Sequence, residues 1–295
     1  MKNYIAISGI TTAEEAVQTL NAFRNAGYTR VSDYRPVIST YVKSKSLAGK
    51  KVKGKRHPKV KRLPSIFKAV NGRLGTILKY TTNNMEQLAG QVDQLMGMLQ
   101  GNRLCQTLQI DKSWPDICQV HGIKKRFPWL EIILTANRHV CELPPKEIAE
   151  RFKYYQEVAD CILIDPSGDL FHGSNFDRSV AVYSEIRQSC PDMKFGFAGG
   201  LSPENVGPYL EALILRLGTR DFSLDTHGVG LRTPLSNRLG NDILNLAKVG
   251  GFLNRVSVLL KAQKNPRFSA PPPSDKRSPF YRHPAPGQIH GRTGR

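Results

Sequence analysis

A glycine pair followed by residues that favour a helix start is the strongest chemical signal in the sequence. Residues 198–206 read Ala-Gly-Gly-Leu-Ser-Pro-Glu-Asn-Val. Gly199 and Gly200 let a backbone approach a ligand closely, and Ser202 with Pro203 is typical of a helix N-cap and first position. Because a helix N-terminus points free N–H groups at an anion, the segment predicts a phosphate-binding site. A turn that binds nothing can also carry two glycines.

Polar side chains stand where other apolar runs of the sequence end. An aspartate at such a place can be a general acid or base, and it is also common as a turn residue or helix cap. The histidine and glycine that follow the last of these runs belong to the same group of candidates. The candidate residues are Ser8, Gln109, Asp165, Asp225, His227 and Gly228.

Apolar runs alternate with helix-length stretches along most of the chain. The runs that read as strands cover residues 4–8, 36–42, 74–80, 104–110, 130–135, 161–165, 194–198 and 222–225. The stretches that read as helices cover residues 12–26, 84–99, 145–158, 177–189, 203–213 and 238–260. Strands alternating with helices indicate parallel pairing, and eight units in about 250 residues favour a closed (β/α)₈ TIM barrel. Such a barrel brings the candidate residues to one face, where its strands end.

The net charge of +19 is concentrated in two segments. Residues 43–68 hold eleven Lys or Arg and no acid, and residues 261–295 hold eight Lys or Arg and one acid. The rest of the chain is nearly neutral. We therefore predict a barrel over residues 1–260, a basic insertion at 43–63 on its active face, and a basic tail at 261–295. The tail is rich in proline and poor in aliphatic residues, so we expect it to be disordered.

Three roles are open for the basic insertion 43–63. It can gather an anionic substrate, it can contact nucleic acid, or it can be a solvated insertion that binds nothing. It contains no Phe, Tyr or Trp on which a base could stack. Any binding of nucleic acid would therefore be driven by charge and would not be specific for sequence.

The five cysteines are scattered without a CxxC pair. Buried free thiols are the simplest interpretation, and they are typical of a reducing compartment. The N-terminus lacks the apolar stretch of a signal peptide, and no apolar run approaches about 18 residues. We therefore expect a cytoplasmic protein that has no membrane partner. No His, Cys and Asp cluster has the spacing of metal ligands, so we predict neither a metal nor a cofactor, and the oligomeric state is left open.

The chain resembles the phosphoribosylanthranilate isomerase family over about residues 3–260. The strongest pieces of the resemblance are Gly9-Ile10-Thr11, Asp165 with the downstream Gly173-Ser174-Asn175-Phe176-Asp177, and the segment 198–206. The resemblance is looser at the eighth strand, where Asp225-Thr226-His227-Gly228 stands in place of the family's Asp-Val-Ser-Ser-Gly. The resemblance implies a (β/α)₈ barrel that opens a phosphorylated aminosugar and shifts its double bond in an Amadori rearrangement.

The resemblance also implies catalytic roles for three residues. The family's general acid, an aspartate at the end of the sixth strand, corresponds to Asp165. Its general base is a cysteine at the end of the first strand, where this chain has Ser8. A thiol is easily brought to a basic thiolate, whereas an alcohol titrates far above neutral pH and needs a neighbouring base. His227 is the candidate for that base.

Binding roles follow from the same resemblance. The candidate phosphate-binding residues are Gly199, Gly200, Ser202 and Gly228. The candidate substrate-binding residues are Gln109, Lys43, Lys45 and Asp225. The two lysines lie near the place of an arginine that holds the substrate's carboxylate in the family. A lysine keeps the charge but lacks the bidentate fork of an arginine, so specificity for anthranilate is not implied.

Two functions from different classes remain open. The leading hypothesis is an aldose–ketose isomerase of the Amadori type that acts on a phosphorylated sugar derivative with an altered base. The alternative is a catalytically inactive barrel that binds a ligand or a partner, with charge-driven association with nucleic acid as a further option. Asp165 and the glycine pair favour the isomerase, and Ser8 favours the inactive barrel.

Overall fold

Eight parallel strands close into a barrel in chain order, with β8 paired to β1. The computed structural model describes residues 1–28, 33–52, 56–166, 174–226, 230–235 and 242–261. The strands are β1 (Tyr4–Ser8), β2 (Arg35–Lys43), β3 (Gly75–Thr81), β4 (Thr107–Ile110), β5 (Glu131–Asn137), β6 (Cys161–Asp165), β7 (Lys194–Ala198) and β8 (Ser223–Asp225). The predicted TIM barrel is confirmed, and each strand overlaps its predicted range.

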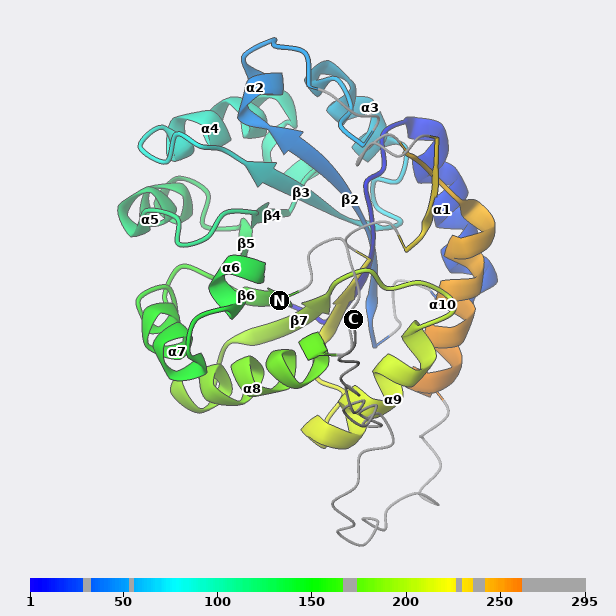
Figure 1. The fold of residues 1–295 in the computed structure, drawn as a ribbon. Coiled ribbons are helices and arrows are strands. Elements are labelled where there is room, and N and C mark those ends of the chain that lie inside the picture. Colours follow the sequence, from blue (N-terminus) through cyan, green and yellow to red (C-terminus); the bar gives the residue numbers. More distant parts are fainter. Residues whose placement is uncertain (29–32, 53–55, 167–173, 227–229, 236–241, 262–295) are drawn as a thin grey trace, which may run out of the picture. The chain divides into compact units, whose positions relative to one another are not determined.

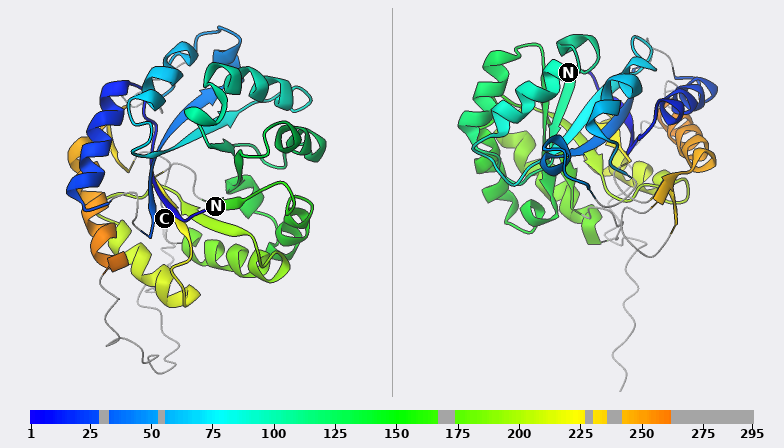
Figure 2. Two further views of the ribbon diagram at one scale, coloured as in Figure 1. Left: turned by 180° about the vertical axis from the view of Figure 1, so that it is seen from behind. Right: turned by 90° about the horizontal axis from the view of Figure 1, so that it is seen from above.

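Helices surround the barrel on its outside (Figures 1 and 2). They are α1 (Ala13–Asn25), α2 (Ser44–Leu47), α3 (Leu63–Lys68), α4 (Leu88–Met98), α5 (Ile117–Arg126), α6 (Arg138–Cys141), α7 (Pro145–Lys153), α8 (Ser174–Ser189), α9 (Val206–Leu217) and α10 (Leu246–Lys261), with 3-10 turns η1 (Val60–Arg62) and η2 (Gly101–Arg103). Thr12 caps α1 by accepting a hydrogen bond from the Glu15 N–H. None of the helices in the described ranges is long and apolar enough to cross a membrane.

Three predicted helices begin later than expected, and the one expected over 84–99 is α4, which starts at Leu88. The helix expected over 203–213 is α9, which starts only at Val206, because residues 203–205 form a turn in which the Ser202 hydroxyl accepts from the Glu204 N–H. The helix expected over 238–260 is α10, which starts at Leu246 after Asn245 accepts from the Lys248 N–H. A hairpin of β9 (Arg232–Pro234) and β10 (Asp242–Leu244) precedes it. Neither the hairpin nor the helices α3 and α5 was predicted.

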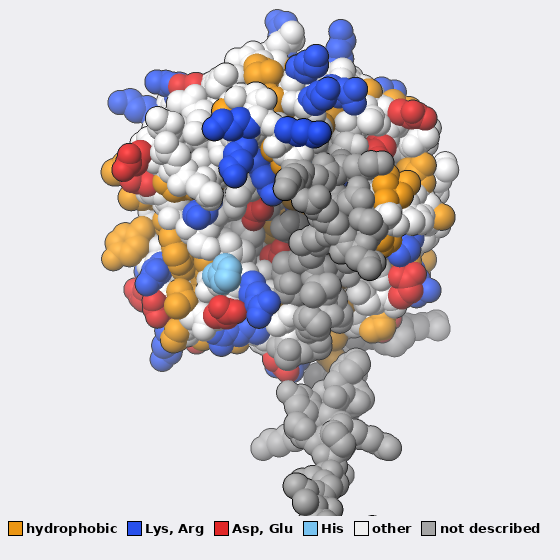
Figure 3. Space-filling model, turned by 45° about the horizontal axis from the view of Figure 1, so that its top comes forward, with side chains coloured by type: hydrophobic (Ala, Val, Ile, Leu, Met, Phe, Trp, Pro, Cys, Tyr) orange, Lys and Arg blue, Asp and Glu red, His pale blue; other side chains and the backbone are white. Residues whose placement is uncertain are grey.

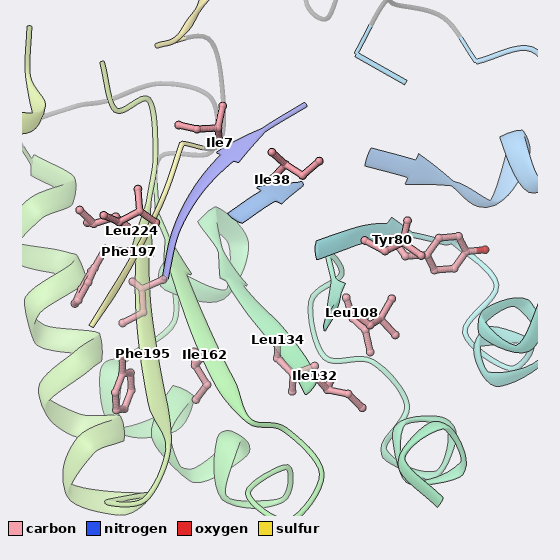
Figure 4. Packing of buried hydrophobic residues seen from close by; sticks show 14 of the residues in the cluster. Ile7, Ile38, Tyr80, Leu108, Ile132, Leu134, Ile162, Phe195, Phe197 and Leu224 are labelled. Atoms are coloured by element: carbon pink, nitrogen blue, oxygen red, sulfur yellow. The ribbon is translucent and has the colours of Figure 1, made fainter. Parts of the chain in front are cut away.

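Side chains alternate along each strand between the surrounding helices and the inside of the barrel. The outward-facing residues are large and apolar, and they form the main core between strands and helices (Figure 4). Those labelled in Figure 4 are Ile7, Ile38, Tyr80, Leu108, Ile132, Leu134, Ile162, Phe195, Phe197 and Leu224. This layer packs the outward-facing side of the strands against the surrounding helices.

The inside of the barrel is divided into an apolar layer and a polar layer. The apolar layer is a separate buried cluster of Tyr4, Ala6, Val37, Ile77, Ile133, Cys161, Leu163 and Ala198. The next inward-facing positions, toward the carboxyl ends of the strands, are polar and buried. They are Ser8, Ser39, Lys79, Gln109, Thr135, Asp165 and Asp225. We call this second set the polar layer; it lies at the end of the barrel where TIM-barrel enzymes carry their active sites.

Candidate active site

A hydrogen-bonded network of four side chains fills the polar layer at β1, β2, β3 and β8. Ser39 Oγ donates to Ser8 Oγ at 2.8 Å, and Ser8 Oγ donates to Asp225 Oδ1 at 2.6 Å. Lys79 Nζ donates to the same Asp225 oxygen at 2.8 Å, and both side chains of this ion pair are fully buried. The group beside Ser8 is therefore a carboxylate that has its own counter-ion.

The Lys79–Asp225 ion pair is covered on one side by an aromatic ring. Lys79 Nζ lies 5.2 Å from the centroid of the Tyr41 ring, within the range in which the face of a ring attracts a cation. The second carboxylate oxygen of Asp225, Oδ2, is buried and has no hydrogen-bond partner among the described residues. Leaving a buried oxygen without a donor is costly, so Oδ2 is a favourable place for a ligand group or a proton.

Asp165 ends β6 on the same face of the barrel. Its side chain is 1 % exposed, and it pairs in register with Asn137 of β5. Strand β7 separates it from β8, and there the small residue Ala198 pairs with Asp225. The two carboxyl groups thus project into the barrel from alternate strands, which is how side chains of one layer come together in this fold.

Gln109 lies in the polar layer on β4, and the buried thiol of Cys141 lies close enough to Asp165 to interact with its charge. Gln109 Nε2 donates to Thr135 Oγ1 at 3.0 Å, and its Oε1 has no hydrogen-bond partner in the described ranges. Burial, reinforced by the charge of Asp165, raises the pKa of the Cys141 thiol to about 12. Burial likewise raises the pKa of Cys105 to about 12. Neither thiol forms a thiolate near neutral pH, so neither replaces a cysteine base. The expectation of buried free thiols holds for every cysteine but Cys118, which is exposed.

The glycine pair forms a turn that is shaped for a close approach. Gly199 and Gly200 have φ values of 119° and 57°, in the region that favours glycine. A Cβ on Gly230, just beyond β8, would lie 2.0 Å from the carbonyl oxygen of Leu201, so the segments after β7 and β8 are in direct contact. These are the segments that hold phosphate in many barrels of this fold.

Asn205 fixes the shape of this turn. Its Nδ2 donates to the Gly200 carbonyl at 3.0 Å, and its Oδ1 accepts from the Ser202 N–H at 2.8 Å. The Ser202 N–H is therefore used inside the turn. The N–H groups of Gly199 and Gly200 donate to no backbone carbonyl within the described residues, so they are the donors that remain for an anion.

The second half of the basic insertion is fastened to the hairpin that follows β8. Arg56 Nε lies 2.9 Å from both carboxylate oxygens of Asp242. Arg232 also pairs with Asp242, and its Nη1 donates to the Gly9 carbonyl at 3.1 Å. All three charged side chains are buried. The insertion, the hairpin and the end of β1 are thus joined at the mouth of the barrel.

His57 packs beside this junction as a neutral ring. Its imidazole makes an edge contact with Tyr41, with ring centroids 6.1 Å apart. Burial, followed by the nearby charge of Lys43, lowers the pKa of His57 to about 4. Near neutral pH the ring is therefore uncharged and adds nothing to the positive charge of the insertion.

The remaining predicted residues are not part of the polar layer. Lys43 is the last residue of β2 and Lys45 lies in α2, and both are exposed at the rim. His227 and Gly228 lie outside the described residues, so their predicted roles stay predictions. Among the described residues, the group beside Ser8 that could act as a base is Asp225, which was predicted to bind substrate.

Several residues of the site were missed. They are Ser39, Tyr41, Arg56, Lys79, Arg232 and Asp242. Lys79 had a usable signal, because a lysine inside an apolar strand run either faces a polar interior or breaks the strand. Arg232 and Asp242 had none, because Asp242 fell inside the helix predicted over 238–260 and Arg232 lay in a stretch for which no element was predicted. In the described part of the chain, no group of three or more His, Cys, Asp or Glu side chains is placed to hold a metal ion.

The chain is similar to known proteins in sequence and in fold. A family model described as N-(5'phosphoribosyl)anthranilate (PRA) isomerase matches residues 46–223. No curated protein matches the chain. The matched range contains Lys79, Asp165 and the glycine pair, whereas Ser8 and Asp225 lie on either side of it.

Solved structures share the fold at low sequence identity. Phosphoribosyl anthranilate isomerase from Thermotoga maritima aligns with 86 % of this chain and 98 % of its own, at 17 % identity and a TM-score of 0.56. A phosphoribosyl anthranilate isomerase in complex with reduced 1-(o-carboxyphenylamino)-1-deoxyribulose 5-phosphate aligns with 86 % of this chain and 97 % of its own, at 16 % identity and a TM-score of 0.53. The catalytic domain of a chitinase from Pyrococcus furiosus aligns with 87 % of this chain and 95 % of its own, at 11 % identity and a TM-score of 0.55. Likeness across such different enzymes shows the fold alone.

Proposed function

The chain belongs to the phosphoribosylanthranilate isomerase family, and from this we propose that it is an aldose–ketose isomerase acting on a phosphorylated sugar derivative. The observation that supports the proposal most directly is the carboxylate of Asp225 beside Ser8, at the position where the family has its thiol base. With Asp165 two strands away, the polar layer holds one carboxyl group for each of the two proton transfers.

Asp225, rather than Ser8, is the base in this proposal. A carboxylate is too weak a base to turn an alcohol into an alkoxide, because model aspartate titrates near ~3.9 and an alcohol far above neutral pH. The hydrogen bond from Ser8 Oγ instead holds Asp225 in place, and the Lys79 ammonium balances its charge. The buried Oδ2, which has no described partner, accepts the substrate proton.

The two carboxyl groups act in sequence. Asp165 donates a proton to the ring oxygen, and the C1–O bond breaks to give an open-chain iminium ion. Asp225 then takes the proton from C2, and the electrons of the C2–H bond form the C1–C2 double bond of an enolamine. The protonated Asp225 then gives a proton to C1 and the Asp165 carboxylate takes the C2 hydroxyl proton, which yields the ketose and restores both groups. General base catalysis of this kind contributes roughly 10²- to 10⁴-fold.

The phosphate of the substrate binds at the glycine turn after β7. The N–H groups of Gly199 and Gly200, which donate to no backbone carbonyl of the described residues, and the contact of Gly230 with this turn support that assignment. Ser202 and Gly228 complete the proposed phosphate site, and Gln109, Lys43 and Lys45 the proposed substrate site. A related isomerase is bound to a phosphorylated aminosugar analogue, and we assign this chain a ligand of that class.

Exchange of substrate hydrogen with solvent tests the function without knowledge of the natural substrate. The full chain is incubated in D₂O with phosphoribosylanthranilate and with a panel of phosphorylated aldoses and aldosylamines, and NMR follows the loss of the C2 proton and the appearance of deuterium at C1 of the ketose product. We expect exchange with at least one phosphorylated aldosylamine and none with its dephosphorylated form. Absence of exchange throughout the panel, with a thermal shift caused by the same compounds, would support the inactive binding barrel instead.

The inactive barrel is favoured by one observation. Asp225 is already occupied by Lys79 and Ser8, and no thiol stands at the end of β1. Ser8→Cys separates the two functions, because a chain that lacks only the family's base should gain isomerisation of phosphoribosylanthranilate. We expect a trace gain at most, since Asp225 already holds that position.

A further inference from the structure

A row of exposed cations runs along the outside of the barrel from the basic insertion to the opposite end of β3. We call it the basic stripe. Its members are Lys59, Lys61, Arg62, Lys68, Arg73 and Arg103, all of them exposed. Figure 3 shows Lys and Arg side chains gathered at the top of the view, on the side that carries α2 and α3.

The helix α3 aligns the middle of the stripe. Leu63, Ile66 and Phe67 are buried against the barrel, whereas Lys61 and Lys68 remain exposed. Lys61 lies in the 3-10 turn η1 just before α3, and Lys68 is the last residue of α3. The six residues of α3 rise by about 9 Å, so the helix separates these two lysines along the outside of the barrel.

Two neighbouring cavities continue the line past α3. One, of about 290 Å³, is lined by Arg35, Arg73 and Arg103, and the other, of about 480 Å³, by Lys68 and Arg103. No Asp or Glu lines either cavity. Arg35 is paired with Glu131, but its buried Nε has no hydrogen-bond partner in the described ranges. The end of the stripe is thus a hollow with an excess of positive charge.

Stability of the fold does not account for these charges. Arg73 donates to the Ala69 carbonyl and so caps the end of α3. Among the described residues, none of the six cations has an ion pair with a carboxylate, and placing them in a row adds repulsion. The buried Arg56–Asp242 pair nevertheless fastens the insertion at the start of the stripe. The row is held in position at a cost, which is typical of a binding surface.

We propose that the basic stripe binds the phosphate backbone of double-stranded nucleic acid without specificity for sequence. A duplex presents about one negative charge per 1.7 Å of its axis, so cations spread along the length of α3 and beyond it meet several phosphates. The aromatic side chain of α3, Phe67, is fully buried, and the stripe itself contains no aromatic residue. Single strands are bound largely by stacking on aromatic rings, so the stripe fits a duplex better. The surface lies on the outside of the barrel and does not depend on the isomerase activity.

The test compares two charge-matched double variants of the full chain. Lys61→Gln with Lys68→Gln removes two cations of the stripe, and Lys125→Gln with Lys146→Gln removes two exposed cations elsewhere. Binding to a labelled duplex of random sequence is measured by fluorescence anisotropy between 50 and about 200 mM salt. We expect the stripe variant to bind roughly tenfold or more weakly and to lose about 1.8 from the slope of log K against log salt. The control variant should match the unmodified chain in both.

Three results would overturn the proposal. The first is equal binding by the two double variants, which would make the net charge alone responsible. The second is loss of all binding on deletion of residues 264–295 with no effect of Lys61→Gln and Lys68→Gln, which would assign the binding to the tail. The third is no binding to the duplex at 50 mM salt, or tighter binding of a single strand of equal length.

Discussion

The two layers inside the barrel are built from the same strands but by opposite rules. The apolar layer consists of residues such as Ile77, Ile133 and Leu163, which fill the barrel with no polar partner to satisfy. Two residues further along the same strands stand Lys79, Thr135 and Asp165. The apolar layer stabilises the fold by burial alone. In the polar layer, each buried charge or hydroxyl needs a hydrogen-bond partner. A polar atom of this layer that has no partner among the described residues, such as Asp225 Oδ2, is available to a ligand.

The Lys79–Asp225 pair gives the largest expected effect. Lys79→Met leaves the Asp225 carboxylate buried without its counter-ion, which typically costs about 3–5 kcal/mol. Adding Asp225→Asn to this variant removes the unpaired charge and should restore most of the loss. Both variants are measured by urea unfolding followed by circular dichroism. Equal stability of the single and double variants would mean that the unpaired Asp225 charge does not cause the loss of stability.

A truncation in the apolar layer should affect stability only. Leu163 packs against Gly196, where a Cβ would lie 2.9 Å from Leu163 Cδ1. Leu163→Ala should cost about 2–5 kcal/mol through lost contacts and a cavity. The increase in melting temperature caused by a phosphorylated ligand should remain as large as in the unmodified chain. Loss of that increase would show that the two layers do not act separately.

The glycine turn extends the comparison to the rim of the barrel. Gly200→Ala places a Cβ at a φ of 57° and beside the proposed phosphate site, so it should abolish the thermal shift caused by phosphorylated sugars. Gly218→Ala is the matched control, because its φ is 62° and nothing lies within 4 Å of the added Cβ. Both variants should lose about 1–2 kcal/mol, and only the first should lose the ligand. An unchanged ligand affinity in Gly200→Ala would remove the phosphate site from the account.

A smaller effect is expected from His57 at acid pH. Its pKa is about 4 in the folded chain and near ~6.5 when unfolded, so the unfolded state binds the proton more readily. The free energy of unfolding should therefore fall as the pH drops from about 6.5 towards 4. His57→Gln should flatten this part of the profile, which is read from urea unfolding at several pH values. An identical slope in the variant would place the titration elsewhere.

The barrel was predictable because eight apolar runs, separated by helix-length stretches, leave few other arrangements. The starts of α9 and α10 were not, because Pro203 and the stretch after residue 238 are compatible with a helix, and only tertiary contacts decide against it. The predicted acid Asp165 and the glycine turn came from local residue order. The contact between Ser8 and Asp225 joins residues 217 positions apart. No local pattern specifies such a contact; it follows from closure of the barrel between β8 and β1.

The central claim is that Asp225 is the base and Ser8 only positions it, and the rate at which the substrate loses its C2 proton tests this most directly. The rate is measured for the unmodified chain, Ser8→Ala and Asp225→Asn, with Lys79→Met/Asp225→Asn as a second form in which no buried charge is left unpaired. The account predicts a loss of roughly 10²-fold or more in both forms that lack the carboxylate. It predicts a smaller loss for Ser8→Ala, since the Asp225 carboxylate keeps the Lys79 ammonium and loses only the hydrogen bond from Ser8. Full activity without the carboxylate, together with loss of activity in Ser8→Ala, would contradict it.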